Sequence, residues 1–260
     1  MDSVNQTLYI PLYGKAYVTK KVVILNDQKA VDIWGKEGFL IKGKSKSKML
    51  AYYMAMRAKV FDRWVVDCLK DYPSAIVLHI GCGLDNRYGR INPSTCDWYD
   101  IDFEDVISVR KKYYNDSKNY HMLSYDMRDE KLFEDLKPAS NVIVVMEGIS
   151  MYVQSSEIQV FFERLANRFE NIHLLLDAYS EFAAKMSKYK NPINEVGVYE
   201  VYGIDHPEKL NIKELSYRQS HLITPNYLID ELSGLEKIIF KKLYAGKFSS
   251  RLYYLYEFRK

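Results

Sequence analysis

The sequence lacks long apolar runs, a large set of cysteines and a large net charge. No segment approaches the roughly 20 consecutive apolar residues of a membrane span, and the polar start MDSVNQ is unlike a signal peptide. The three cysteines, Cys68, Cys82 and Cys96, match no zinc-site spacing, and an odd number argues against a disulfide framework. We therefore expect a cytoplasmic protein with no membrane partner and no metal.

The nearly balanced charge gives no indication of nucleic-acid binding. The 37 basic and 34 acidic residues leave a formal net charge of +3, which is too small to predict a nucleic-acid partner. With 260 residues, of which 48% are hydrophobic and 27% charged, the chain has the composition of an ordinary globular protein. We expect one domain spanning residues 1–260.

Apolar strands and amphipathic helices alternate along the first two thirds of the chain. Helical spacing of apolar residues predicts helices, and short continuous apolar runs predict strands. The predicted helices are 49–72, 104–114 and 156–169, and the predicted strands are 75–80, 96–103, 119–126, 141–148 and 171–179. Strands this apolar are covered on both faces, so the predicted fold class is α/β with a mostly parallel, doubly wound sheet.

The last third of the chain has a less regular pattern. Residues 180–220 show no sustained periodicity, which suits either an inserted cap over a site or a plain surface excursion. A short helix is predicted at 224–232. The apolar stretches 236–244 and 251–260 are interpreted as two strands, which would form an antiparallel hairpin at the end of the sheet.

A glycine turn follows the first predicted strand. In VLHIGCGLDNR, Gly81 and Gly83 end a buried run, as in α/β domains whose backbone approaches a ligand closely. The dinucleotide fingerprint needs a third small residue, but Asn86 stands at that position. A nicotinamide dinucleotide is therefore disfavoured.

Three acids end successive predicted strands. Asp102, Asp126 and Glu147 would meet at the carboxyl edge of the sheet, because parallel strands point the same way. There they could accept hydrogen bonds from ribose hydroxyls, an adenine amine and an ammonium group, and S-adenosylmethionine carries all three. Each aspartate alone could instead cap a neighbouring helix or turn.

Arg57 is a charged residue in the middle of the apolar helix predicted at 49–72. Its guanidinium group must find an anion or extend to solvent. The anion is either a ligand or a structural acid such as Asp62.

Six ordered motifs carry a family resemblance: LYGKAYVTKK, RAKVFD, IGCGLDNR, WYDIDFEDVISVRK, YDMRD and MEGISMY. Together they are similar to the leucine carboxyl methyltransferase superfamily, especially its bacterial branch of tetracenomycin-type polyketide O-methyltransferases. The likeness covers residues 8 to about 180. It implies a class I methyltransferase-like sheet with an antiparallel C-terminal hairpin strand and a cap or lid insertion. The implied parts are an N-terminal helical lid at 1–72, a cofactor-binding core at 73–179, a substrate cap at 180–220 and a C-terminal helix and hairpin at 221–260.

The resemblance implies S-adenosylmethionine as the cofactor and S-adenosylhomocysteine as its product. The glycine turn would lie under the methionine part, Asp102 would hold the ribose, and the Asp-Met pair of YDMRD would flank adenine. Arg57 would pair with the cofactor carboxylate. The sequence departs from the family where Asn86 replaces a common threonine, Lys15 replaces arginine and LNDQKA replaces Asp-Asp-Pro. The residues expected to bind the cofactor are Lys15, Arg57, Gly81, Gly83, Asp102, Asp126, Met127 and Glu147.

The activity that the resemblance implies is transfer of a methyl group to a carboxylate or hydroxyl oxygen of a small molecule. Tyr152 and Tyr179 follow two predicted strands and are candidates for orienting this acceptor. Three alternatives stay open: a protein C-terminal carboxyl methyltransferase, a non-catalytic cofactor-binding module and an NAD(P)-dependent oxidoreductase. The residues themselves identify no acceptor and no general base.

Overall fold

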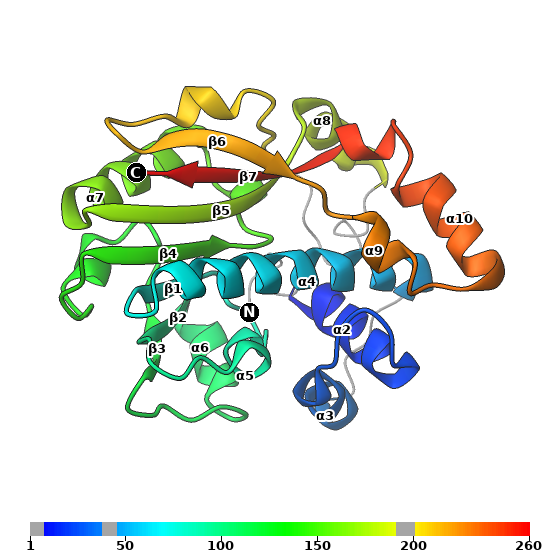
Figure 1. The fold of residues 1–260 in the computed structure, drawn as a ribbon, viewed down its shortest axis with the longest axis horizontal. Helices are drawn as coiled ribbons and strands as arrows, with labels where there is room; N and C mark the ends of the chain where they lie inside the picture. Colours follow the sequence, from blue (N-terminus) through cyan, green and yellow to red (C-terminus); the bar gives the residue numbers. More distant parts are fainter. Residues whose placement is uncertain (1–7, 38–45, 191–200) are drawn as a thin grey trace.

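A twisted sheet forms the centre of the fold. The structure is a computed structural model that describes residues 8–37, 46–190 and 201–260. Within these residues, seven strands form one sheet in the order β3-β2-β1-β4-β5-β7-β6 (Figure 1). The strands are β1 (Ile76–Ile80), β2 (Trp98–Asp102), β3 (Tyr120–Ser124), β4 (Asn141–Met146), β5 (Asn171–Tyr179), β6 (Ser216–His221) and β7 (Tyr253–Arg259). Strands β1 to β5 pair in parallel, whereas β7 runs antiparallel to β5 and β6, which confirms the predicted fold class.

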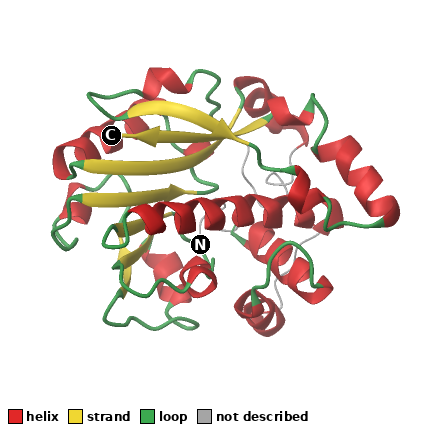
Figure 2. Cartoon of the chain, viewed as in Figure 1, coloured by secondary structure: helices red, strands yellow, loops and turns green. Residues whose placement is uncertain are grey.

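Helices cover both faces of the sheet, as the apolar strands predict (Figure 2). Successive residues of a strand point to opposite faces, so each strand contributes to two cores. Val77 packs in the cluster that contains Phe61 of α4 (Lys48–Asp71). Leu78 packs in the other cluster, with the apolar face of α7 (Ser155–Arg168). The sheet is therefore buried between two apolar layers.

The N-terminal helices cross the long helix α4. Helix α2 (Tyr9–Lys21) packs against α4, and α3 (Gln28–Glu37) packs against α2. Gly14 lies at the crossing, where an added Cβ would be 3.0 Å from Cβ of Met54 and 3.1 Å from a backbone oxygen of α4. A residue without a side chain is therefore needed for this close approach. The remaining helices are α5 (Arg87–Ile91), α6 (Glu104–Arg110), α8 (Glu181–Lys190), α9 (Asn226–Ile229) and α10 (Gly234–Tyr244), with 3₁₀ turns η2 (Glu130–Phe133), η3 (Ser150–Tyr152), η5 (Pro207–Leu210) and η6 (Ser249–Arg251).

The C-terminal hairpin is the main place where the structure differs from the sequence prediction. Residues 236–244 were expected to form a strand, but they lie in helix α10. The edge strand that pairs with β7 is β6, which begins inside the stretch 180–220 that shows no sustained periodicity and ends one residue beyond it. The reason is local: β6 is short and polar (SYRQSH) and lies at the sheet edge, whereas α10 has a run of apolar residues that imitates a strand. Part of the predicted cap, residues 191–200, lies outside the described residues.

Two further findings concern the described residues as a whole. No helix among them is long and apolar enough to cross a bilayer. The same residues contain no group of three or more His, Cys, Asp or Glu side chains that could hold a metal ion.

Candidate active site

One cavity gathers the residues that the sequence singles out. It has a volume of about 790 Å³ and is lined by α2, α4 and the loops that follow the parallel strands. Both acceptor candidates, Tyr152 and Tyr179, line it. Its wall also contains all eight residues expected to bind the cofactor: Lys15, Arg57, Gly81, Gly83, Asp102, Asp126, Met127 and Glu147. The structure thus brings these residues to one place, while the ligand that each would hold stays a prediction.

The glycine turn forms the floor of this cavity after β1. Gly81 and Gly83 have φ values of +66° and +52°, a region that side-chain-bearing residues rarely adopt. The Gly81 N–H donates to the carbonyl oxygen of Ile101 at 2.8 Å and holds the turn beside β2. An added Cβ at Gly81 would lie only 2.2 Å from Cγ2 of Ile149. Backbone conformation and space both require glycine here.

Asp102 ends β2 beside the glycine turn. Its Oδ2 accepts a hydrogen bond from the Gly83 N–H at 2.8 Å, and its Oδ1 accepts one from the Phe103 N–H at 2.8 Å. Burial raises the pKa of Asp102 to about 6, against the effect of these two donors. The carboxylate therefore has unused acceptor capacity in a poorly solvated place, where a ligand hydroxyl would bind it strongly.

Asp126 and Met127 follow β3 and line the same cavity. Arg128 holds the Asp126 carboxylate, with its Nε at 2.9 Å and 3.0 Å from the two oxygens. Although burial opposes it, this arginine lowers the pKa of Asp126 and keeps the group ionised at neutral pH. Met127 is buried and supplies an apolar wall. The pair thus combines an acceptor with an apolar surface.

Glu147 follows β4 and lies between two arginines. Its Oε1 is 3.0 Å from Nε of Arg57, and its Oε2 accepts a hydrogen bond from Arg87. Although burial opposes ionisation, Arg87 and then Arg57 lower the pKa of Glu147 to about 2. Arg57 also forms an ion pair with Asp177 at 3.0 Å and donates to the hydroxyl of Tyr253 at 2.8 Å. This end of the cavity therefore presents paired charges of both signs.

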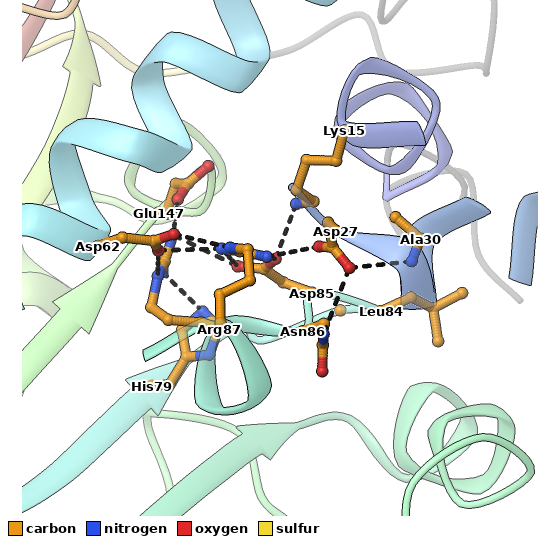
Figure 3. A network of polar contacts seen from close by, with 12 residues as sticks. Lys15, Asp27, Ala30, Asp62, His79, Leu84, Asp85, Asn86, Arg87 and Glu147 are labelled. Carbon is orange, nitrogen blue, oxygen red and sulfur yellow. Dashed lines mark hydrogen bonds and ion pairs between the residues drawn. The ribbon is translucent and has the colours of Figure 1, made fainter. Parts of the chain in front are cut away.

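A buried network of charges continues from this end toward the N-terminal helices (Figure 3). Lys15 of α2 reaches Asp85 in the glycine loop, with 3.0 Å between Nζ and Oδ1. Asp85 also pairs with Arg90 at 2.6 Å, and Arg90 binds Asp27 at 2.7 Å. Although burial opposes it, Arg90, Lys15 and Arg87 hold the pKa of Asp85 well below its usual range. The network joins the segment before α3, helix α2 and the turn after β1.

Asp62 is not the partner of Arg57, so the expectation that named Asp62 as its structural acid is wrong. Asp62 instead binds Arg87 at 2.8 Å and Arg90 at 2.7 Å. Arg57 lies one and a half turns earlier on α4 and points to Glu147, which lines the cavity. The anions that Arg57 meets in the structure are protein carboxylates, those of Glu147 and Asp177, and its pairing with a ligand anion stays a prediction.

The profile of the leucine carboxyl methyltransferase family matches residues 13–166, more than half of the chain. The chain belongs to the leucine carboxyl methyltransferase family. This confirms the resemblance drawn from the six motifs.

Two curated relatives of this family member extend over most of its length. The present chain is 28% identical over 212 residues to the tetracenomycin polyketide synthesis O-methyltransferase TcmP of Streptomyces glaucescens. The match covers 81% of the chain and 78% of that protein. The chain is 23% identical over 252 residues to the S-adenosyl-L-methionine-dependent methyltransferase dpfgK of Gibberella zeae, covering 87% and 85%. The match to TcmP agrees with the predicted branch.

Solved structures share the fold at low sequence identity. A duf574 family protein from Streptomyces avermitilis has a TM-score of 0.58 at 12% identity, covering 95% of this chain and 96% of that one. Magnesium protoporphyrin IX methyltransferase (ChlM) from Synechocystis, solved with bound SAH, has a TM-score of 0.51 at 13% identity, covering 90% and 100%. At such identities the likeness concerns the architecture.

Next to this charged part, the cavity wall of this family member is apolar and aromatic. Tyr179 contacts Tyr253 with 4.9 Å between ring centroids, and Tyr152 lies in the turn η3 after β4. Around these rings, α8 and the segment that begins near the end of α10 complete the wall with Phe182, Met186, Leu243 and Phe248. The cavity therefore has a charged lobe beside Glu147 and an apolar lobe beside Tyr179.

Sequence reasoning missed several charged residues of the network. The side chain of Arg87 has no exposed surface, and less than a tenth of the side-chain surface is exposed in Arg90, Asp85 and Asp177. A signal was present, because Arg87 and Arg90 are spaced by three and would share one side of a helix after the glycine turn. Nothing in the spacing identifies Asp177, because an acid inside an apolar strand has no local partner.

Proposed function

We propose that this protein is an S-adenosylmethionine-dependent O-methyltransferase that acts on a small molecule. The observation that carries the proposal is the convergence of a positive-φ glycine turn and three strand-end carboxylates, those of Asp102, Asp126 and Glu147, on one cavity. Membership of the leucine carboxyl methyltransferase family supports the same activity. Cytoplasmic location, a single domain and the absence of a metal requirement remain part of the proposal.

The residues of the charged lobe fit the chemical groups of this cofactor. Asp102 would accept hydrogen bonds from the ribose hydroxyls, because its half-buried carboxylate has unused acceptor capacity. Asp126 and Met127 would meet the adenine amine and ring. Glu147 would face the ammonium group of the methionine part, and Arg57 and Lys15 would face its carboxylate. This end of the cavity offers side chains of both charges for the two groups.

The bound cofactor supplies an activated methyl group on a sulfonium sulfur, so the protein needs mainly to position the acceptor. Tyr152 and Tyr179 are placed in the cavity wall to orient an acceptor oxygen. A carboxylate acceptor would already be ionised at neutral pH, whereas a hydroxyl acceptor would pass its proton to a base or to water as the new bond forms.

The size and lining of the cavity support a small-molecule acceptor. A volume of about 790 Å³ lies in the range of ligand pockets that hold a small organic molecule. The apolar lobe next to the charged lobe would accommodate a second ligand that is less polar than the cofactor. The relative TcmP, an O-methyltransferase of polyketide synthesis, supports the same acceptor class for this chain.

Calorimetric titration tests the cofactor part of the proposal. The protein is titrated with S-adenosylmethionine, S-adenosylhomocysteine, NAD and NADP. We expect micromolar binding of the first two ligands and none of the dinucleotides, because Asn86 replaces the third small residue of the dinucleotide fingerprint. Binding of NAD in place of the sulfonium ligand would refute the proposal.

A methyl-transfer assay separates an enzyme from a cofactor-binding module. Isotope-labelled S-adenosylmethionine is incubated with a panel of aromatic acids, phenols, aliphatic acids and a peptide with a free C-terminal leucine. We expect labelled product from a small molecule and none from the peptide. Transfer to the peptide alone would identify a protein carboxyl methyltransferase instead, and cofactor binding without any transfer across the panel would contradict the enzymatic role.

A further inference from the structure

Helix α10 exposes an apolar face that nothing in the described part of the chain covers. Leu235, Ile238 and Leu243 are 75%, 64% and 55% exposed, and Ile239 beside them is 44% exposed. They are spaced by three and four residues, so they share one face of the helix. Phe248, just beyond the helix, is 69% exposed. We call these five side chains the α10 face.

The opposite side of α10 fixes the orientation of this face. Phe240 is fully buried and meets the ring of Tyr52 on α4 with 6.3 Å between centroids. Tyr244, one turn later, stacks on Phe240 at 5.4 Å. At the start of the helix, Glu236 accepts hydrogen bonds from Lys48 at 2.8 Å and from the hydroxyl of Tyr52. The inward side is thus occupied by Glu236, Phe240 and Tyr244, so the most exposed side chains of the α10 face lie on the outer side of the helix, and α10 itself lies at the edge of the molecule in Figure 1.

The charges around the α10 face are almost all positive. Segment 234–251 contains five basic residues and one acidic residue, a formal charge of +4, whereas the whole chain carries +3. The single acid, Glu236, is already held by Lys48 and by Lys21 on the inward side, and Lys237 pairs with Asp230, just before the segment, at 2.9 Å. The four other basic side chains, at 241, 242, 247 and 251, are exposed. An apolar helix face with exposed lysines beside it and within it is typical of helices that lie in the interface of a membrane.

We propose that the α10 face docks the protein on a membrane surface that contains anionic lipids. The apolar side chains would enter the boundary between headgroups and acyl chains, and the surrounding lysines would meet the anionic headgroups. A second copy of this chain fits the face less well, because two segments of charge +4 would meet each other. The sequence alone predicted no membrane partner, because that expectation rested on the absence of a spanning segment and of a signal peptide.

The position of the α10 face gives this docking a consequence for the candidate site. Leu243 and Phe248 belong both to the exposed face and to the cavity wall. Phe248 also meets Phe182 of α8, with 6.5 Å between ring centroids. A membrane under α10 would therefore adjoin the apolar lobe of the cavity.

Vesicle flotation of the full-length protein tests the proposal. The protein is mixed with vesicles of phosphatidylcholine alone or of phosphatidylcholine with 30% phosphatidylglycerol, at about 0.05 M and 0.15 M salt. We expect binding to the anionic vesicles, weaker binding at the higher salt concentration and little binding to the neutral vesicles, because screening acts on the lysine contribution. Binding to both kinds of vesicle alike, or to neither, overturns the proposal.

Two matched pairs of variants separate the face from the rest of the surface. Ile239→Ser is compared with Val160→Ser on α7, because both side chains are 44% exposed. Lys241→Glu with Lys242→Glu is compared with Lys111→Glu with Lys112→Glu, which lie beyond α6 and carry the same change of charge. We expect the α10 variants to weaken vesicle binding by about tenfold for the isoleucine and by at least about 25-fold for the lysine pair.

The remaining outcomes are also decisive. Equal losses in the two double lysine variants would show that binding follows total charge, and equal losses in Ile239→Ser and Val160→Ser would show that the α10 face has no special role; either result would overturn the proposal. A concentration-dependent dimer that Ile239→Ser abolishes would show that the face covers a second copy and would overturn it too. Unchanged affinity for S-adenosylhomocysteine in the lysine variants checks that they are folded, and it is independent of vesicle binding, so failure of the proposed function and failure of docking are distinguishable.

Discussion

If Asp102 holds the ribose as proposed, cofactor binding should depend on pH between pH 5 and pH 7. Ribose hydroxyls donate hydrogen bonds, so the ionised carboxylate binds them and the protonated group binds them poorly. With a pKa of about 6, Asp102 is mostly ionised at pH 7 and about nine-tenths protonated at pH 5. The affinity for S-adenosylhomocysteine should therefore fall about tenfold between pH 7 and pH 5, as protonation competes with binding.

The variant Asp102→Asn supplies the control. It keeps the shape of the side chain and an oxygen for the Gly83 N–H, but it cannot ionise. Calorimetry at pH 5, 6, 7 and 8 should show binding that is about 10- to 100-fold weaker than wild type at pH 7, for the loss of charge-assisted hydrogen bonds, and that no longer changes with pH. If the variant keeps the tenfold change, the titrating group lies elsewhere and the reasoning is wrong. Asp177 would then be the first candidate, because burial raises its pKa as well.

The same pKa shift has an opposite effect on stability. Because the folded pKa of about 6 exceeds the value near 3.8 of an exposed aspartate, the folded chain binds more protons than the unfolded chain between these pH values. The contribution of Asp102 to stability is therefore complete below about pH 4 and is lost as the pH rises through 6. The difference corresponds to about 3 kcal/mol at most. Denaturant unfolding at pH 7 should show Asp102→Asn to be at least as stable as wild type, and a large loss of stability would contradict the assigned cause.

Four further substitutions separate structural from chemical roles. Glu147→Gln removes the shared carboxylate of two buried guanidinium groups and should lower the free energy of unfolding by about 3–5 kcal/mol, measured with denaturant. Gly81→Ala should cost about 2 kcal/mol or more and weaken S-adenosylhomocysteine binding, because its Cβ would meet Ile149 at positive φ. Tyr152→Phe and Tyr179→Phe should slow methyl transfer to an identified acceptor and leave cofactor affinity within about twofold. A larger loss of cofactor affinity would show that these tyrosines contact the cofactor and not the acceptor alone.

The parallel core of the fold could be predicted because its signals are local. Continuous apolar runs such as that ending at Gly81 are interpretable as buried strands whatever their neighbours are. The C-terminal region could not, since β6 is a polar edge strand that is defined by its pairing with β7 rather than by its own residues. Helix α10 was mistaken for a strand because its apolar residues are contiguous enough to hide the helical spacing, and its outward face has no core to reveal it.

Some residues of the candidate site could likewise be predicted from the sequence, and others could not. Asp102, Asp126 and Glu147 could be located because they follow strands, and strand ends of a parallel sheet meet at one edge. The partners that set their charge could not be located, because they arise from pairing between distant segments. Arg87 and Glu147, for example, are 60 residues apart and meet only after the sheet has formed.

The charged network explains why the glycine turn is followed by Asp-Asn-Arg and then by a second arginine. Asp85 holds Lys15 of the N-terminal helix, Arg87 holds Glu147 after β4, and Arg90 holds Asp27 before α3. Helix α5 has only five residues, yet its arginines and the acid before it tie three separate parts of the chain to the turn that forms the cavity floor. Removing one partner of a buried ion pair leaves the other charge without compensation. The N-terminal helices cannot move from the cavity without breaking such pairs, so their position over the site is a direct consequence of the same residues that complete its charged lobe.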